Sequence, residues 1–303
     1  MSKGVKYSLL LQNKKGEKMK HRRNRNNEML KHMGKLSVLL VVAVNLIWGA
    51  SLPNSWADND RNELPFKAAE MFIEFNSTAG DTGLQVFLDD DNWREITISD
   101  PRDKTIFTVK GKSTLGRQGL TELFFESVEP ELADLPIVKF LKRFPRGDYE
   151  FEGIRNDGVE LESEVEFTHV IPCGPEVLPK DGTVLDTDLE TVIRWAEVKK
   201  VVDPAATDAA GETVCTEPIN LGQHLEINSY QVILENSDIR LIVDLTSSNR
   251  FLTVPSELLK DNTLYIFEVL AKEVSGNQTI TEGFFCTGPD LEEEDCVNLF
   301  ETR

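Results

Sequence analysis

The chain has 303 residues and a formal net charge of −19. An acidic protein repels phosphate backbones and anionic lipid, so this charge argues against binding to nucleic acid or to a membrane surface. The charge is unevenly distributed, however. Residues 1–35 carry eleven lysines and arginines against two glutamates, and residues 36–57 carry no charge at all.

The first 57 residues are typical of a secretion signal. A basic stretch precedes an apolar run over residues 36–52, and small residues stand at the −3 and −1 positions before Asp58. We expect cleavage between Ala57 and Asp58, and Met33 would begin a more compact version of the signal. The alternative is a membrane anchor, but the apolar run is short for a bilayer span and Asn45 interrupts it.

Removal of this signal would leave about 245 residues, a length that suits two ordinary domains. The remaining chain has 22 basic and 50 acidic side chains, a net charge of −28. We expect a secreted or periplasmic protein that has no membrane span after cleavage. Its partner would be a protein or a cationic molecule at the cell envelope, and not a nucleic acid.

Residues 66–171 predict an N-terminal β-rich domain. Apolar and polar side chains alternate along several runs, which is typical of strands with one face on a core and the other in water. Turns rich in Gly, Asp and Pro separate these runs, as in a β-sandwich. Residues 137–144 instead have apolar side chains at helical spacing and predict one short helix.

Glutamate occupies every second position of the run that contains Glu160, Glu162, Glu164 and Glu166. Two interpretations remain open for this ladder. It could be a solvated strand face that resists edge-to-edge aggregation. It could also be a docking face for a basic or cationic partner.

A calcium site is the main cofactor hypothesis. Asp89, Asp90 and Asp91 are consecutive, Asp81 lies upstream, and we expect these residues in loops. Calcium prefers several oxygen ligands from a bent backbone, although this spacing does not match an EF-hand loop. The alternative is an acidic turn that is only solvated. We expect no other metal or cofactor.

Residues 175–288 resemble a fibronectin type III domain. The segment that contains Leu259, Thr263 and Tyr265 looks like the tyrosine corner of this family, with Asp261-Asn262 in place of the usual Pro-Gly, and an alternating strand follows it. The resemblance implies that the tyrosine hydroxyl bonds to the backbone of the turn.

Two further residues support the same resemblance. Trp195 ends a run that is similar to the second strand of the family, and Tyr230 begins one that is similar to the third. The resemblance implies that both side chains pack in the core. It departs from the family at residues 199–222, which predict a long inserted loop, while residues 289–303 predict an acidic tail in solvent.

All four cysteines lie in the second half of the chain, and an even number in an exported protein indicates disulfides. No Cys-x-x-Cys motif occurs, so zinc and redox sites are poorly supported. The residues alone leave the connectivity open. The fibronectin resemblance implies the pairs Cys173–Cys215 and Cys286–Cys296, because each pair would share one end of the sandwich.

Three segments of the first domain, residues 75–83, 119–126 and 144–153, look like a group of secreted bacterial proteins. Those proteins pair such a domain with a C-terminal fibronectin type III domain and have no assigned activity. The resemblance implies architecture and export, and no mechanism. We therefore predict an all-β chain of two β-sandwich-like domains in tandem, the first with one short helix and the second fibronectin type III-like.

Signals for catalysis are weak. Only His169 and His224 would remain after cleavage, and the sequence has no Gly-x-Ser-x-Gly, His-Glu-x-x-His or phosphate-binding glycine loop. We expect a non-catalytic binding or structural module and not an enzyme. The alternatives are an enzyme that acts on extracellular glycan or peptide, and an accessory subunit of one. A cleft with either histidine beside a serine or a carboxylate would favour the enzyme.

Overall fold

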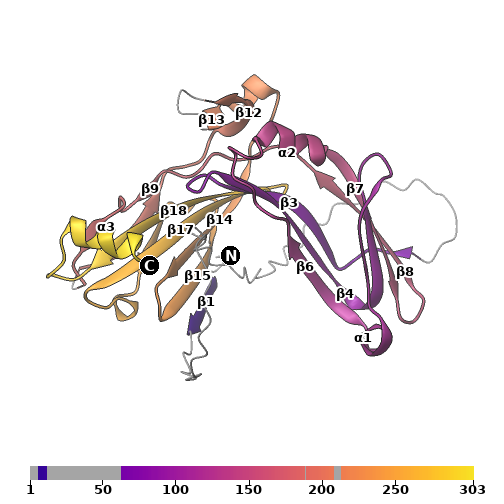
Figure 1. Cartoon of the computed structure of the whole chain (residues 1–303), viewed down its shortest axis with the longest axis horizontal. Helices are drawn as coiled ribbons and strands as arrows, with labels where there is room; N and C mark the ends of the chain where they lie inside the picture. Colours follow the sequence, from indigo (N-terminus) through magenta and orange to yellow (C-terminus); the bar gives the residue numbers. More distant parts are fainter. Residues whose placement is uncertain (1–5, 12–62, 188, 208–212) are drawn as a thin grey trace, which may run out of the picture. The chain divides into compact units, whose positions relative to one another are not determined.

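The residues that the computed structural model describes are 6–11, 63–187, 189–207 and 213–303. All of them belong to one compact unit (Figure 1). The apolar run of the predicted signal and its cleavage site at Ala57 and Asp58 lie outside these residues. Of the predicted signal, only strand β1 (Lys6–Leu11) is described, and it pairs antiparallel with β15 (Ile239–Thr246). Among the described residues, no helix has the length and apolar character needed to cross a bilayer.

The first domain is a β-structure with two short helices. Its strands are β2 (Glu63–Leu64), β3 (Ala68–Asn76), β4 (Asp81–Ser99), β5 (Thr105–Lys110), β6 (Leu120–Glu126), β7 (Gly147–Arg155) and β8 (Glu160–Phe167). Its helices are α1 (Ser113–Gln118) and α2 (Ile137–Arg143). Helix α2 is the helix that the sequence predicts. Helix α1 is not predicted, because it buries no side chain and so has no apolar stripe.

Strand β4 holds the first domain together, because it has neighbours on both sides along most of its length. Its first half lies between β3 and β6, and its second half lies between β5 and β7. The pairing changes near Asn92, which has a positive φ of 53°. This long strand therefore contributes to two layers, one formed with β3 and β6 and the other with β5, β7 and β8.

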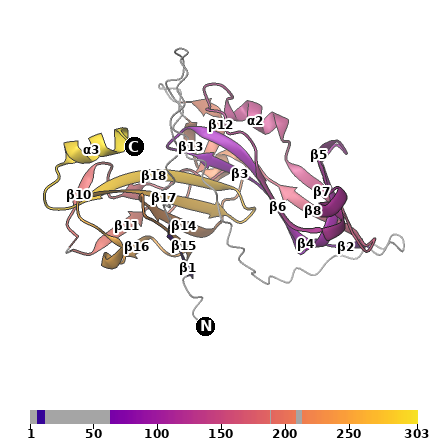
Figure 2. The same ribbon diagram turned by 60° about the horizontal axis from the view of Figure 1, so that its bottom comes forward.

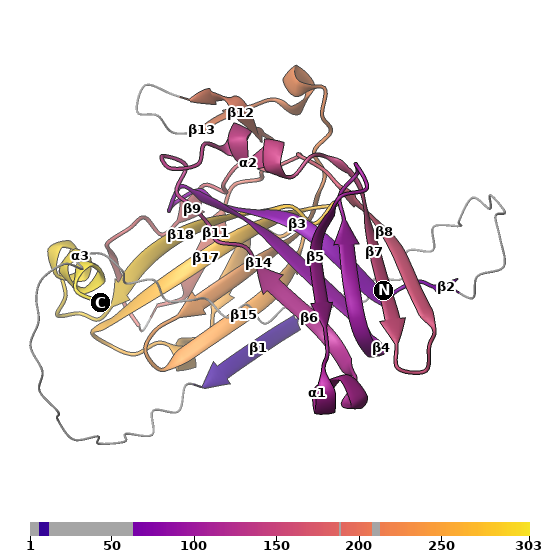
Figure 3. The same cartoon turned by 45° about the vertical axis from the view of Figure 1, so that its right-hand side comes forward.

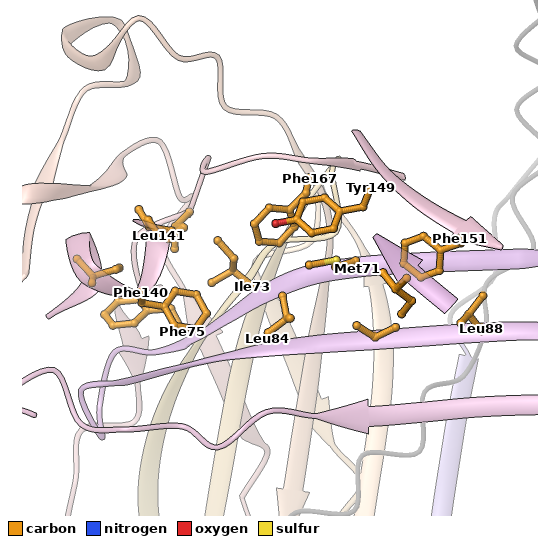
Figure 4. Close-up of a cluster of buried hydrophobic side chains, with 14 of the residues drawn as sticks. Met71, Ile73, Phe75, Leu84, Leu88, Phe140, Leu141, Tyr149, Phe151 and Phe167 are labelled. Atoms are coloured by element: carbon orange, nitrogen blue, oxygen red, sulfur yellow. The ribbon is translucent and has the colours of Figure 1, made fainter. Parts of the chain in front are cut away.

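The core of the first domain lies between these layers and is closed at one end by α2. Alternate side chains of β3, β4, β7 and β8 point into it, as the period of two predicts. Figure 4 labels ten of these side chains: Met71, Ile73, Phe75, Leu84, Leu88, Phe140, Leu141, Tyr149, Phe151 and Phe167.

The second domain is a sandwich of two antiparallel layers (Figure 2). The larger layer contains β15, β14 (Ile227–Glu235), β17 (Thr263–Glu273) and β18 (Gln278–Thr287), and β10 (Thr183–Leu185) adds parallel to β18. The smaller layer contains β9 (Val177–Leu178), β11 (Thr191–Trp195) and β16 (Phe251–Val254). The predicted all-β fold is confirmed, and the second domain has the predicted sandwich form.

Two segments of the second domain are more ordered than the sequence suggests. The expected long loop contains a β-hairpin of β12 (Val201–Thr207) and β13 (Thr213–Thr216), followed by the 3-10 helix η1 (Pro218–Leu221). The expected solvated tail contains helix α3 (Glu293–Glu301). This helix is anchored because Phe300 stacks on Phe284, with ring centroids 4.0 Å apart. A second 3-10 helix, η2 (Ser256–Leu258), precedes β17.

The two domains share one sheet. Strand β18 of the second domain pairs in parallel with β3 of the first (Figure 3). The larger layer of the second domain therefore continues into strands β3, β4, β7 and β8 of the first. The register places Gln278 opposite Glu74 and Ile280 opposite Asn76. Backbone pairing between domains leaves little freedom at the boundary, in contrast to tandem domains that are joined only by a linker.

Candidate functional site

The outer face of β7 and β8 is strongly acidic. Three cross-strand pairs place exposed carboxylates directly opposite each other: Asp148 with Glu166, Glu150 with Glu164, and Glu152 with Glu162. Among the described residues, no lysine or arginine forms an ion pair with any of the six. Like charges that face each other across strands are destabilising, so the buried side chains between them must hold this face together.

Strand β8 lies close to the edge of the sheet. The short strand β2 pairs with it only at Glu160 and Leu161. Glu63 of β2 hydrogen-bonds to Glu162, and this bond, with burial and the neighbouring carboxylates, raises the pKa of Glu162. The edge-protection and docking interpretations of the glutamate ladder both agree with this position.

The four aspartates of the calcium hypothesis are Asp81, Asp89, Asp90 and Asp91. The expectation that they stand in loops is wrong, because all four lie in strand β4. Asp81 and Asp89 are eight positions apart along this strand, roughly 26 Å of extended chain. Asp90 is fully buried and accepts two hydrogen bonds from Arg155, at 2.9 and 2.5 Å. Asp91 forms an ion pair with Lys67 at 2.6 Å. The structure therefore does not assemble a calcium site from these four residues.

A different acidic cluster lies beside the domain boundary. Glu74 on β3, Glu126 at the end of β6 and Glu129 in the following loop each offer a carboxylate oxygen, and these oxygens all lie within 4.8 Å of one another. Glu74 is buried, Glu129 is half-buried and Glu126 is exposed. The sequence gives no signal for this group, because its members come from two strands and a loop.

Gly83 on β4 provides the space for this cluster. Gly83 lies opposite Glu74 in the sheet, and a Cβ atom at Gly83 would stand 2.6 Å from both Cγ and Oε1 of Glu129. The Glu129 side chain therefore folds over the glycine and reaches the other two carboxylates. Any larger residue at position 83 would displace it.

Proximity and burial change the acidity of the cluster. Burial, followed by a hydrogen bond and the charge of Glu126, raises the pKa of Glu129 to about 9. Burial also raises the pKa of Glu74 to about 7, although hydrogen bonds from Gln278 and Gln85 and the charge of Lys272 lower it. The three carboxylates are therefore difficult to ionise together unless a cation joins them.

The boundary itself is built around Asn277, which is 1% exposed. Its side-chain oxygen accepts a hydrogen bond from the Ile73 N–H at 2.8 Å. Its Nδ2 donates to Thr168 O at 3.2 Å, to Thr168 Oγ1 at 2.9 Å and to Val170 O at 3.0 Å. One buried amide thus connects the β17–β18 turn to two separate segments of the first domain.

The residues singled out by the fibronectin resemblance lie in the second domain as expected. The Tyr265 hydroxyl accepts from the Lys260 N–H at 2.9 Å and donates to Leu258 O at 3.0 Å. Trp195 and Tyr230 are buried with ring centroids 5.4 Å apart. Leu259 is buried and Thr263 is half-buried beside the same corner. Asn262 has a positive φ of 51°, which asparagine tolerates better than most residues.

The cysteines form the pairs that the resemblance implies. Cys173 is bonded to Cys215, and Cys286 is bonded to Cys296. The second bond fixes helix α3 to the end of β18. Two disulfides suit an oxidising compartment such as the cell envelope or the extracellular space.

An open cavity of about 570 Å³ lies between α2, β12 and η1, and His169, Arg146 and Asp203 contribute to its lining. His169 Nε2 is 2.8 Å from Phe144 O, and burial lowers the pKa of this histidine. The Asp203 carboxylate accepts from the Ala205 N–H at 2.9 Å. No serine, threonine or cysteine lines this cavity in the described part of the chain, whereas His169 and the carboxylate of Asp203 both do.

No protein-family model matches the chain, and no curated protein matches it. Similar solved structures include the FN1–FN3 domains of chicken CNTN1, with 11% identity over 74% of this chain and 69% of that chain and a TM-score of 0.27. Tp47, a 47-kilodalton lipoprotein of Treponema pallidum, has 11% identity over 77% of this chain and 53% of its own, with a TM-score of 0.32. A tetra-tandem repeat in the extending region of a large adhesion protein has 12% identity over 72% of this chain and 48% of its own, with a TM-score of 0.22. Similarity at this level does not assign a function.

Proposed function

We propose that this protein is an exported, non-catalytic binding module whose acidic β7–β8 face docks a cationic segment of a partner protein at the cell envelope. The observation that carries the proposal is the set of three cross-strand carboxylate pairs on one exposed face. Within the described residues, no lysine or arginine forms an ion pair with these carboxylates. A bound cationic chain would relieve their mutual repulsion.

The architecture supports this role. The face lies on a sheet whose other side packs on the core, so its carboxylates keep a fixed spacing. The pairing of β18 with β3 and the two disulfides hold the remainder of the protein in a defined arrangement. A rigid binding surface loses less conformational entropy when a partner docks than a mobile surface does.

The test measures binding of an octalysine peptide at physiological salt. In one variant Glu150, Glu152 and Glu164 become glutamine, and in the matched control three exposed glutamates elsewhere, Glu257, Glu293 and Glu294, become glutamine. Both variants lose the same charge. We expect the face variant to raise the Kd of the peptide by about tenfold or more, and the control to change this Kd by less than about twofold.

Equal weakening in the two variants would show attraction by net charge alone and would overturn the proposal. Absence of saturable peptide binding to the native protein would also overturn it. In that case the glutamate ladder is better explained as protection of the β8 edge. That function predicts that the face variant forms concentration-dependent aggregates while the control stays monomeric.

A further inference from the structure

A second acidic group, the cluster of Glu74, Glu126 and Glu129, has features of a ligand site that the β7–β8 face lacks. Its three carboxylates converge within 4.8 Å, whereas those of the face are spread along two strands. Two oxygens that bind the same calcium ion at about 2.4 Å can stand up to about 4.8 Å apart on opposite sides of it. The three carboxylates of the cluster are therefore close enough to bind one cation.

The independent observation is Gln85. Its side chain is 1% exposed, and its Oε1 has no hydrogen-bond partner among the described residues. Gln85 lies two residues along β4 from Gly83 and directly opposite Glu126 on β6, so its side chain shares the face of the cluster. The Gln85 amide also hydrogen-bonds to Glu74. A buried, unpaired amide oxygen beside converging carboxylates is costly unless it acquires a ligand.

The strand positions explain how the four side chains meet. Glu74 on β3 and Glu126 on β6 flank β4 on its two sides. Between them, Gly83 has no side chain, and Glu129 fills the space above it. The exposed Glu126 leaves this arrangement open to solvent, so an ion can enter.

We propose that Glu74, Glu126, Glu129 and the amide oxygen of Gln85 bind one calcium ion beside the boundary between the two domains. Carboxylate and amide oxygens are the ligands that calcium prefers, and water completes its roughly six to eight positions. The set is irregular and combines side chains from three strands and one loop. Magnesium requires a near-ideal octahedron of shorter bonds, so this geometry favours calcium.

A calcium ion at this position would also affect how firmly the two domains are joined. Glu74 accepts a hydrogen bond from Gln278 of β18, the strand that joins the second domain to β3. Bound calcium would fix the Glu74 carboxylate and, through Gln278, strengthen the pairing of the two domains. The calcium site is independent of the acidic face that we propose for partner binding, because no residue belongs to both.

The test uses calcium chloride alone as the ligand, measured by isothermal titration after treatment with a chelator and by the shift in thermal midpoint. We expect one calcium ion per protein with a Kd below about 1 mM, the range of extracellular modules. Magnesium at the same concentration should raise the midpoint much less. Glu126→Gln and Glu129→Gln should each weaken calcium binding by about tenfold or more.

The matched control is Glu122→Gln, which removes an exposed charge from the same strand outside the cluster. It should change the calcium Kd by less than about twofold. Glu129→Gln should be at least as stable as the native protein in chelator, because glutamine keeps the neutral hydrogen-bonded form of this side chain. Its loss of calcium binding therefore cannot be a failure to fold.

Three results would overturn the proposal. The first is no saturable calcium binding below about 10 mM, and the second is an equal thermal shift with magnesium. The third is equal weakening by Glu122→Gln and the two cluster variants, which would indicate diffuse counterion attraction. None of these results bears on octalysine binding by the β7–β8 face, so the two proposals can fail separately.

Discussion

Replacement of Asn277 by alanine should weaken the coupling between the two domains, so that they unfold separately. The Asn277 side chain makes four hydrogen bonds, and three of its partners are backbone groups of the first domain. Alanine can make none of these bonds. The neighbouring β18–β3 ladder would remain, but its end beside the β17–β18 turn would lose its attachment.

The expected loss can be worked out from the partners. The N–H of Ile73 belongs to a fully buried residue, and leaving it unpaired costs about 1–3 kcal/mol. The carbonyl groups of Thr168 and Val170 belong to half-buried residues that water can reach, so each lost bond costs about 1 kcal/mol. Thr168 Oγ1 keeps its hydrogen bond with Ser275 Oγ, so its lost bond adds little. We therefore expect Asn277→Ala to lower the free energy of unfolding by about 3–5 kcal/mol.

Urea unfolding followed by tryptophan fluorescence provides the assay. After signal removal the chain would retain Trp93 in the first domain and Trp195 in the second. Variants that keep only one of the two tryptophans therefore report on one domain each. We expect coincident transitions with Asn277 present and separate transitions in Asn277→Ala, because the boundary couples the two domains.

The control is Asn298→Ala, an exposed asparagine of helix α3 that should change stability by less than about 0.5 kcal/mol. An Asn277→Ala effect as small as this control would refute the reasoning. It would show that the boundary is held by strand pairing alone. Coincident transitions in Asn277→Ala would likewise refute the expected separation.

Three other predictions concern stability measured by urea unfolding. Tyr265→Phe removes a hydroxyl that makes two backbone hydrogen bonds, at 2.9 and 3.0 Å, and should cost about 1–3 kcal/mol; a loss below 0.5 kcal/mol would contradict this. Replacement of both Cys173 and Cys215 by serine opens a loop of 42 residues and should cost about 4 kcal/mol, a loss that reduction of the native protein should at least match. Glu268 lies opposite Glu282, and burial followed by neighbouring carboxylates raises the pKa of Glu268 from 4.5 to about 7. Because the folded state keeps this proton while the unfolded chain loses it, the contribution of protonated Glu268 to the free energy of unfolding is complete below about pH 4.5 and is lost as the pH rises to 7. Glu268→Gln should therefore flatten the decline in stability over this range. An unchanged pH profile of stability would contradict the assignment.

The sequence predicted those features that depend on neighbouring residues. Alternation along the chain indicated the strands, and helical spacing indicated α2, because each pattern reflects which side of a local element faces the core. The tyrosine corner could also be identified, since Tyr265 bonds to residues only a few positions away. Both disulfides followed from the resemblance once the ends of a fibronectin sandwich were known.

Only the tertiary structure determined the domain boundary and the acidic cluster. Strand β18 pairs with β3 although the paired residues are 204 positions apart, and no local pattern encodes that register. The cluster forms because β4 brings β3 and β6 together around Gly83, which places Glu74 beside Glu129.

Strand pairing also explains why the aspartate motif was misleading. Consecutive acidic residues suggest a solvated loop, but Asp90 lies in a strand where Arg155, 65 residues away, balances its buried charge. Local sequence reports on the periodicity of a strand or helix. Which charges meet depends on strand order, because residues that are distant in sequence become neighbours only when the sheet forms.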